Sequence, residues 1–428
     1  MQVKKNNLLK FAFQIMIAFC VIYEVQLKGT STMLTSRKVI LFFLFMLFVL
    51  KNGIYGRVSI KNTHFKNVVY LFVLGIVIVG YVLIITLINN VIGSANGTAI
   101  LPRAVYFVLF GPVIWILAKD YYDDYDEFMR ALLIATFIQV IIVILQYHVK
   151  GFAIFLDGHF ELDAHTTYLD AYKAQNNMRR AVGLGAGDSL LSIDIFLGAV
   201  SSVYFMYKTK NIIKYLILYM LFLYGTAITG SIGMMLTAFV FFMYYIFQFV
   251  VMKKRTAILL TVIIVLAIPL CIFINPSILS EVENSYILSK IYSLFSGNFA
   301  NSRTMKDISS QVIAPISLNT FWGTGIYRGV SANGIMCTSD FGYVQTYFGY
   351  GLVMASLFYL SIFYGMYNAI NNIHDKNIKF IMILLAISIA IAEIKEPYMS
   401  HYGVLYVFFV GTFSYFNNLP IQKIFKNK

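Results

Sequence analysis

The sequence predicts an all-α fold, that of a polytopic integral membrane protein, on three observations. Hydrophobic residues make up 59% of the 428 residues, and charged residues only 12%. A soluble chain of this length could not bury so much apolar surface, so lipid must be a large part of its solvent. Apolar runs of roughly 20 residues, enough to cross a bilayer as a helix, recur along the whole chain. Phe and Tyr are also abundant, with 38 and 31 copies, as expected where many helix ends meet the membrane interfaces.

The apolar runs predict about 12 transmembrane helices in a single membrane domain that covers residues 1–428. Their expected ranges are about 9–25, 38–53, 68–88, 103–118, 128–147, 189–207, 212–229, 231–251, 256–274, 344–367, 378–394 and 402–417. The first run follows several lysines, but no small-residue cleavage site comes after it, so we expect an uncleaved span.

Lysines and arginines in the short loops predict the orientation, because such residues gather on the cytoplasmic side of a membrane. With the N-terminus in the cytoplasm, alternation places the basic loops there, for example around 51–66 and 253–255, and both termini are then cytoplasmic. Two long loops, about 148–188 and 275–343, fall on the external side, and loops of this length usually serve a function. The net charge of +14 therefore indicates orientation and not a nucleic-acid partner.

The first long loop ends in a pattern that could bind an anion. Arg179 and Arg180 precede a glycine cluster formed by Gly183, Gly185 and Gly187, at the start of the sixth expected span. Arginine offers a planar fork of donors for phosphate, and glycines let backbone N–H groups approach an anion near a helix N-terminus. The alternative is a glycine-rich turn whose arginines contact lipid headgroups.

The second long loop carries the sharpest candidates, Arg303, Arg328 and Asp340. Asp340 could act as a base towards a substrate hydroxyl, or it could be the N-cap of the helix that follows, a common position for Asp. Tyr343 and the two tyrosines four and seven positions later would share one helix face. They could contact a sugar, although aromatic residues at this spacing are more often interface anchors.

Further ionisable residues lie at or inside the expected spans. Glu393 and Glu396 are three positions apart at the end of the eleventh span, where they could pair with the loop arginines or mark the membrane boundary. Asp194 lies within the sixth span, where an ionisable residue normally faces protein or water, and the sequence does not identify its partner.

Metal and disulfide chemistry are not indicated. Cys20, Cys271 and Cys337 are far apart and form no CxxC or Cys/His cluster. The pair Asp124 and Asp126 has the spacing of a divalent-ion motif, but it falls on the expected cytoplasmic side, and we interpret it as a solvated acidic turn. We expect no cofactor.

Taken together, these motifs resemble those of bacterial O-antigen or capsular polysaccharide polymerases (Wzy-type), which are related to O-antigen ligases. The resemblance rests on MRRAVGLGAGDSLLS, TGSIG, NSR followed by FWGTG, SDFGYVQTYFGYG and EIKEPY, and on the span count with two large external loops. In the ligases a His commonly stands where this chain has Asp340, which favours the polymerase branch. The family's Ser-Arg pair near TGSIG is absent, since Ile232 follows Ser231.

The resemblance implies a metal-independent membrane glycosyltransferase in the bacterial cytoplasmic (inner) membrane. It would transfer a growing glycan from undecaprenyl pyrophosphate to the next lipid-linked repeat unit on the outer face. The expected partners are this lipid-linked oligosaccharide, the bilayer and a chain-length regulator protein. Asp340 and Arg303 would be catalytic. The expected substrate-binding residues are Arg179, Arg180, Arg328, Tyr343, Glu393 and Glu396. The alternatives are an O-antigen ligase and a lipid-linked oligosaccharide flippase, although long external loops argue against a flippase.

Overall fold

The computed structural model describes most of the chain, and the site below is built from the part it describes. The described residues are 2–30, 34–55, 63–91, 100–118, 121–162, 181–184, 188–209, 211–250, 311–371 and 373–411. The expected span 256–274 and the last residues of the final expected span lie outside these ranges.

Long helices dominate the described residues, and they coincide with the apolar runs of the sequence. In chain order they are α1 (Gln2–Ile22), α2 (Ser36–Tyr55), α3 (Thr63–Ile88), α4 (Leu101–Val108) continuing through the π-helical turn η1 (Leu109–Val113) into α5 (Ile114–Ala118), α6 (Tyr125–His148), α7 (Lys150–His159), α9 (Asp188–Lys208), α10 (Ile212–Thr229), α11 (Ser231–Val250), α17 (Gly342–Tyr350), α18 (Leu352–Asn371), α19 (Lys376–Ala392) and α20 (Tyr402–Tyr406) continuing into η4 (Val407–Gly411). Six helices in this part of the chain are long and apolar enough to cross a membrane. The helical membrane-protein class is therefore supported, while the count of about 12 spans stays a prediction.

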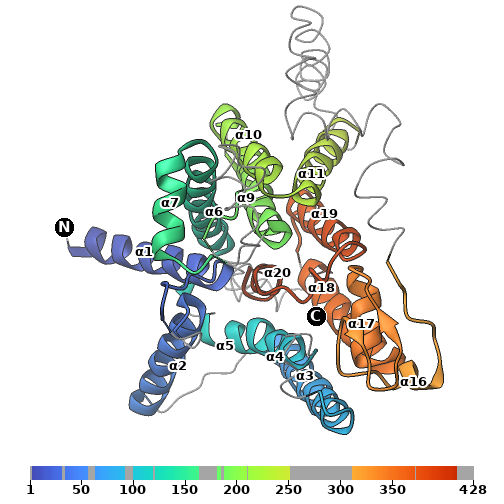
Figure 1. The fold of residues 1–428 in the computed structure, drawn as a ribbon. Helices are drawn as coiled ribbons and strands as arrows, with labels where there is room; N and C mark the ends of the chain where they lie inside the picture. Colours follow the sequence, from blue (N-terminus) through green and yellow to red (C-terminus); the bar gives the residue numbers. More distant parts are fainter. Residues whose placement is uncertain are drawn as a thin grey trace, which may run out of the picture.

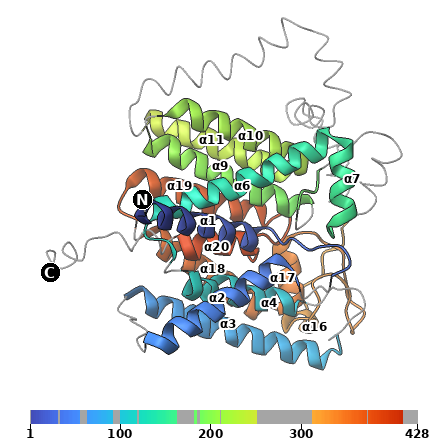
Figure 2. The same ribbon diagram turned by 90° about the vertical axis from the view of Figure 1, so that its left-hand side faces the viewer.

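The helix axes run roughly side by side, and their ends gather at two opposite ends of the molecule (Figure 2). We name as the loop end the one that carries residues 23–30, 34–36, 86–91, 100–101, 181–184, 311–351 and 393–402. Backbone hydrogen bonds join several of these segments, such as Ile100 N–H to the Gly325 carbonyl at 3.0 Å and Gly342 N–H to the Glu393 carbonyl at 2.9 Å. In Figure 2, α7, α16 and α17 lie at this end, and α1 begins at the other.

The sequence prediction was wrong in its detail at the tenth span, which is two helices. α17 ends at Tyr350, and α18 begins at Leu352. Gly351 between them has φ +82°, and a Cβ there would lie 2.4 Å from the Phe321 carbonyl oxygen. Only glycine tolerates this backbone angle and this close approach. The helix therefore breaks at Gly351, although the apolar run of the sequence continues past it.

The two long loops also contain regular structure. The first includes α7, and the described part of the second includes the short helix α16 (Leu318–Phe321) and a hairpin of β1 (Gly329–Val330) and β2 (Met336–Cys337). These strands pair antiparallel, with Gly329 opposite Cys337. The hairpin is a small departure from a purely helical fold.

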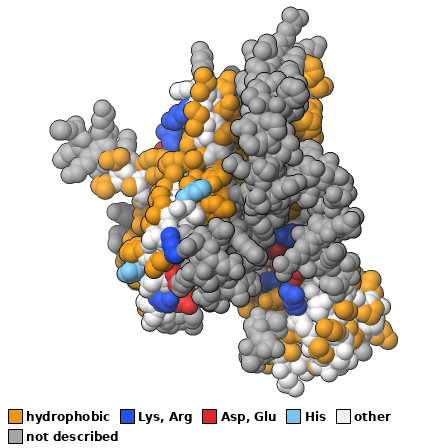
Figure 3. Space-filling view, turned by 45° about the horizontal axis from the view of Figure 1, so that its top comes forward, with side chains coloured by type: hydrophobic (Ala, Val, Ile, Leu, Met, Phe, Trp, Pro, Cys, Tyr) orange, Lys and Arg blue, Asp and Glu red, His pale blue; other side chains and the backbone are white. Residues whose placement is uncertain are grey.

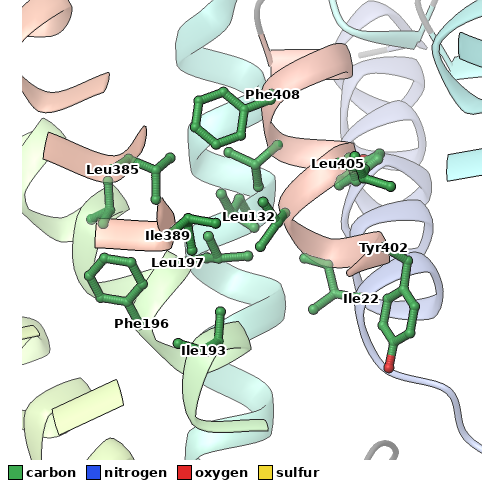
Figure 4. Packing of buried hydrophobic residues seen from close by; sticks show 14 of the residues in the cluster. Ile22, Leu132, Ile193, Phe196, Leu197, Leu385, Ile389, Tyr402, Leu405 and Phe408 are labelled. Carbon is green, nitrogen blue, oxygen red and sulfur yellow. The ribbon is translucent and has the colours of Figure 1, made fainter. Parts of the chain in front are cut away.

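The core is built around α9 and α20, which lie near the centre of the arrangement in Figure 1. In Figure 4, Phe408 of the α20–η4 segment points to the side where Leu132 of α6, Ile193 of α9 and Ile389 of α19 lie, and Leu405 points to the opposite side. All five of these residues are at most 3% exposed. A helix that is apolar all round, as this one is, is stable only when surrounded by other helices.

Small residues let α9 pack closely against its neighbours. A Cβ at Gly198 would lie 2.3 Å from Thr136 Oγ1 of α6, and one at Gly233 of α11 would lie 2.4 Å from the Ser192 carbonyl oxygen. Such contacts are typical of membrane helices, which associate through packing between small residues because lipid provides no hydrophobic driving force between them. The TGSIG turn therefore serves packing.

Apolar side chains cover much of the outer surface of the helices. Ile213, Ile88 and Phe42 are 74%, 68% and 66% exposed. On the face shown in Figure 3, hydrophobic side chains occupy much of the described surface, and charged side chains lie in a few groups. An apolar exterior of this extent fits lipid contact, as the composition predicts.

The acidic turn before α6, interpreted as solvated, is partly so, with the Asp123 side chain 71% exposed, but its other acidic residues also have structural roles. The Asp124 side chain caps α6 by accepting a hydrogen bond from Glu127 N–H, 2.6 Å. Asp126 accepts a hydrogen bond from the Tyr204 hydroxyl and pairs with Lys208 Nζ at 3.1 Å. The turn therefore joins α6 to α9 at the end opposite the loop end.

Candidate functional site

The described candidate residues gather at the loop end. Arg328, Asp340, Tyr343, Glu393 and Glu396 all belong to segments that contact one another there. Three further candidates, Arg179, Arg180 and Arg303, lie outside the described residues. The site is therefore built from the five described residues and their neighbours.

A salt bridge joins Arg328 to Asp340, with Arg328 Nη1 2.9 Å from Asp340 Oδ1. The hairpin explains this pairing, because Arg328 directly precedes β1 and Asp340 follows β2, so the antiparallel register brings the two side chains together. Both side chains are about half exposed, at 49% and 41%. Surface pairs of this kind contribute little stability, so the pair remains available to a ligand.

Asp340 is not the N-cap of α17, which removes one of the two interpretations offered by the sequence. The cap residue is Phe341, and no side chain caps this helix. Instead Gln311 holds Asp340 from both sides. Its Nε2 donates to Asp340 Oδ2, and its Oε1 accepts from Asp340 N–H, both at 2.9 Å.

Glu393 lies beneath the start of α17 and is 1% exposed. Its Oε1 accepts a hydrogen bond from the Tyr359 hydroxyl, and its Oε2 accepts one from Met399 N–H, both at 2.6 Å. Its backbone carbonyl accepts from Gly342 N–H, 2.9 Å, and a Cβ at Gly342 would lie 2.6 Å from Glu393 Oε1. A glycine at this position thus allows the helix that follows Asp340 to approach the buried carboxylate.

Arg103, which the sequence reasoning missed, completes the cluster. It lies in the first turn of α4, its Nη2 donates to Gln345 Oε1 of α17 at 2.9 Å, and its guanidinium lies over the Tyr327 ring, 3.8 Å from the centroid. Its Nη1 is buried without a hydrogen-bond partner among the described residues. Electrostatic attraction also links Arg103 to Glu393. The sequence feature that could have identified Arg103 was its charge at the first position of an expected span. A charged residue there normally only marks the membrane boundary.

Glu396 and Tyr343 have structural partners. Lys395 Nζ lies 3.6 Å from Glu396 Oε1, and the Tyr398 hydroxyl donates to Glu396 Oε2 at 3.1 Å. The Tyr343 hydroxyl donates to the Ala390 carbonyl of α19, 3.1 Å. Tyr343 therefore secures α17 to α19, and the three tyrosines of α17 do not form one shared platform, since Tyr347 bonds to Thr320.

In the described part of the glycine cluster, the backbone N–H groups are bonded to a side chain of the protein. Val182 N–H and Gly183 N–H both donate to Gln146 Oε1, at 2.9 and 2.7 Å. The interpretation of Gly183 as part of an anion-binding backbone was wrong, because its N–H already has a buried acceptor. Gly185 and Gly187 lie outside the described residues.

The arrangement combines cations and carboxylates next to an apolar bundle. Arg103 and Arg328 supply positive charge, while Asp340 and Glu393 supply one half-exposed and one buried carboxylate. Within the ranges that the structure describes, no group of three or more His, Cys, Asp and Glu side chains could hold a metal ion. Such a site could bind an anionic, lipid-anchored substrate and take up a proton from a hydroxyl.

Comparison with family models, with curated proteins and with solved structures finds no match to this chain.

Proposed function

We propose that this protein is a polysaccharide polymerase of the Wzy type, acting on the outer face of the bacterial cytoplasmic membrane through about 12 spans. It transfers a growing glycan from undecaprenyl pyrophosphate to a hydroxyl of the next lipid-linked repeat unit. In this proposal the loop end is external and both termini are cytoplasmic.

The observation that carries the proposal is the guanidinium of Arg103 at the loop end. A buried cationic N–H without an acceptor costs about 1–3 kcal/mol, so a site that keeps one favours an anionic ligand. Guanidinium also matches phosphate oxygens in a planar fork. Arg103 lies at the end of an apolar bundle where the pyrophosphate of a lipid-anchored donor would lie, with Arg328 as a second cation nearby in the same loop cluster.

The reaction needs charge stabilisation and one proton acceptor. The acceptor hydroxyl oxygen bonds to the anomeric carbon of the donor sugar, the bond from that carbon to the pyrophosphate oxygen breaks, and undecaprenyl pyrophosphate leaves. Arg103 and Arg328, with Arg303 and the pair Arg179 and Arg180 of the other loop, neutralise the leaving group. Asp340 takes the hydroxyl proton, positioned by Gln311.

The buried Glu393 has a positioning role in this scheme. It offsets the charge of Arg103 and fixes the start of α17, and so it sets where Asp340 lies. Tyr343 supports the same arrangement by holding α17 against α19. Glu396 borders the site.

The test is deletion of the protein followed by size profiling of the surface glycan, with complementation by variants. We expect glycan limited to one repeat unit in the deletion strain and in Arg103→Ala and Asp340→Asn strains, each with normal protein levels. Arg130→Ala is the matched control, because Arg130 is exposed on α6, and it should restore full length.

Other outcomes would contradict the proposal. Glycan of normal length that never reaches its final acceptor would indicate a ligase. Repeat units that accumulate on the cytoplasmic leaflet would indicate a flippase. Full-length glycan from both site variants would contradict the site.

A further inference from the structure

A second group of buried polar side chains lies at the loop end, apart from the candidate site. Asp194 of α9 and His401 at the start of α20 are 1% and 5% exposed, and Asp194 Oδ1 lies 3.3 Å from His401 Nδ1. A Cβ at Gly403 would lie 2.4 Å from the same oxygen, so glycine there permits the approach of α20 to the carboxylate. This contact identifies the partner that the sequence left open for Asp194.

Several atoms of this group lack hydrogen-bond partners among the described residues. They are Asp194 Oδ1, both ring nitrogens of His401, and the hydroxyls of Tyr23 and Tyr402. The Asp194 and His401 atoms are close but not aligned as a hydrogen bond, so each can still bond to a third group. Tyr23 and Tyr402 are 0% and 6% exposed, and both interact electrostatically with Asp194.

Unsatisfied polar atoms in such number are rare in native interiors, because each one forfeits its hydration on burial. The set mixes donors with acceptors, which suits water better than a bare cation or anion. Buried water typically makes about three hydrogen bonds to such groups. This number of unpaired donors and acceptors therefore favours internal water.

The balance of buried charges indicates that the Asp194 and His401 pair carries one proton. Arg37 of α2 is 2% exposed, and its charge is offset by Glu24, whose carboxylate accepts a hydrogen bond from Arg37 Nη1. Arg37 also lies over the Tyr402 ring, 3.1 Å from the centroid. With Glu24 and Arg37 balanced, an ionised Asp194 beside a neutral His401 would leave one uncompensated negative charge in an apolar interior, which is strongly unfavourable.

We propose that Asp194 and His401 hold one proton between them at neutral pH and, with the hydroxyls of Tyr23 and Tyr402, enclose water inside the helix bundle. In this proposal the proton is on His401, so that an imidazolium lies 3.3 Å from its counter-charge on Asp194 Oδ1. Among the described residues, the charged and titratable groups that interact with the pair or with its tyrosines are Glu24, Arg37, Tyr23 and Tyr402. The site is an internal proton and water site, independent of the proposed transferase activity.

The first experiment measures the protonation of His401 in the full-length protein in lipid nanodiscs. Nitrogen NMR of the protein labelled at histidine distinguishes imidazolium from neutral imidazole, and His401→Gln identifies the His401 signal. We expect imidazolium at neutral pH in the wild type and neutral imidazole in Asp194→Asn, where the counter-charge is gone. The control Asp340→Asn should leave the signal unchanged. Neutral imidazole in the wild type, or imidazolium that survives in Asp194→Asn, overturns the proposal.

The second experiment tests for water through the sign of a stability change. It does not use Asp194→Asn, so it remains informative if that variant fails to fold. Tyr23→Phe and Tyr402→Phe should each lower the melting temperature, because each removes a hydroxyl bonded to internal water. If the hydroxyls had no partner at all, removing them would leave the melting temperature unchanged or raise it, and that result overturns the proposal. Tyr122→Phe, which loses a bond to Tyr406, should lower it, and the exposed Tyr70→Phe should not change it.

Discussion

Replacing Tyr359 by Phe removes one of the donors that hold the buried Glu393 carboxylate. The Tyr359 hydroxyl lies 2.6 Å from Glu393 Oε1, and Glu393 is 1% exposed, so bulk water cannot take the place of the lost donor. A hydrogen bond to a charged group contributes about 1.5–3 kcal/mol, and one between neutral groups about 0.5–1.5 kcal/mol. With Glu393 ionised, as in an assay at alkaline pH, we therefore expect Tyr359→Phe to destabilise the protein by about 2 kcal/mol.

A double-mutant cycle separates this bond from other effects of the substitution. In Glu393→Gln the acceptor becomes a neutral amide, so Tyr359→Phe should cost only about 1 kcal/mol in that background, a coupling of roughly 1 kcal/mol. The free energy of unfolding is measured by denaturant titration of the purified protein in micelles. Tyr367→Phe on the same helix is the matched control, because Tyr367 is 63% exposed.

Two results would refute the reasoning. Equal costs of Tyr359→Phe in both backgrounds would mean that the hydroxyl does not interact with a charged carboxylate. A cost no larger than that of Tyr367→Phe would mean that the bond contributes nothing to stability.

Three further predictions address the turn, the buried arginine and the orientation. Gly351→Ala should destabilise the protein by about 2–4 kcal/mol, because it places a Cβ 2.4 Å from a backbone oxygen at φ +82°; unchanged unfolding in denaturant would show that the break between α17 and α18 is not required. Arg37→Ala should cost about 3–5 kcal/mol, since it strands the Glu24 carboxylate and two backbone carbonyls; a smaller loss in the same assay would mean that water reaches this group. With the native cysteines replaced, Arg328→Cys should react with a membrane-impermeant maleimide in intact cells, and Lys208→Cys only after permeabilisation; the reverse pattern would place the loop end in the cytoplasm.

The candidate site could be predicted from the sequence only in part. Arg328 and Asp340 were recognised because charged residues in a polar loop of an apolar chain are conspicuous, and the structure brings them into contact. Arg103 was missed because its partner Gln345 is 242 positions away, and no local pattern encodes that contact. Whether Asp340 caps α17 also depended on where that helix begins, a matter of one or two residues that hydropathy does not resolve.

Hydropathy was enough to assign the helical membrane class and the ranges of most helices, because the free energy of placing an apolar run in lipid depends on that run alone. Which polar groups meet inside the bundle depends instead on how the helices pack. The loop of residues 311–351 is the clearest case: its charges were evident from the sequence, but its hairpin, the Gly351 break and its contacts with Glu393 and Arg103 arise from packing between distant segments. Packing depends on shape and distance across the fold, and composition along the chain does not record them.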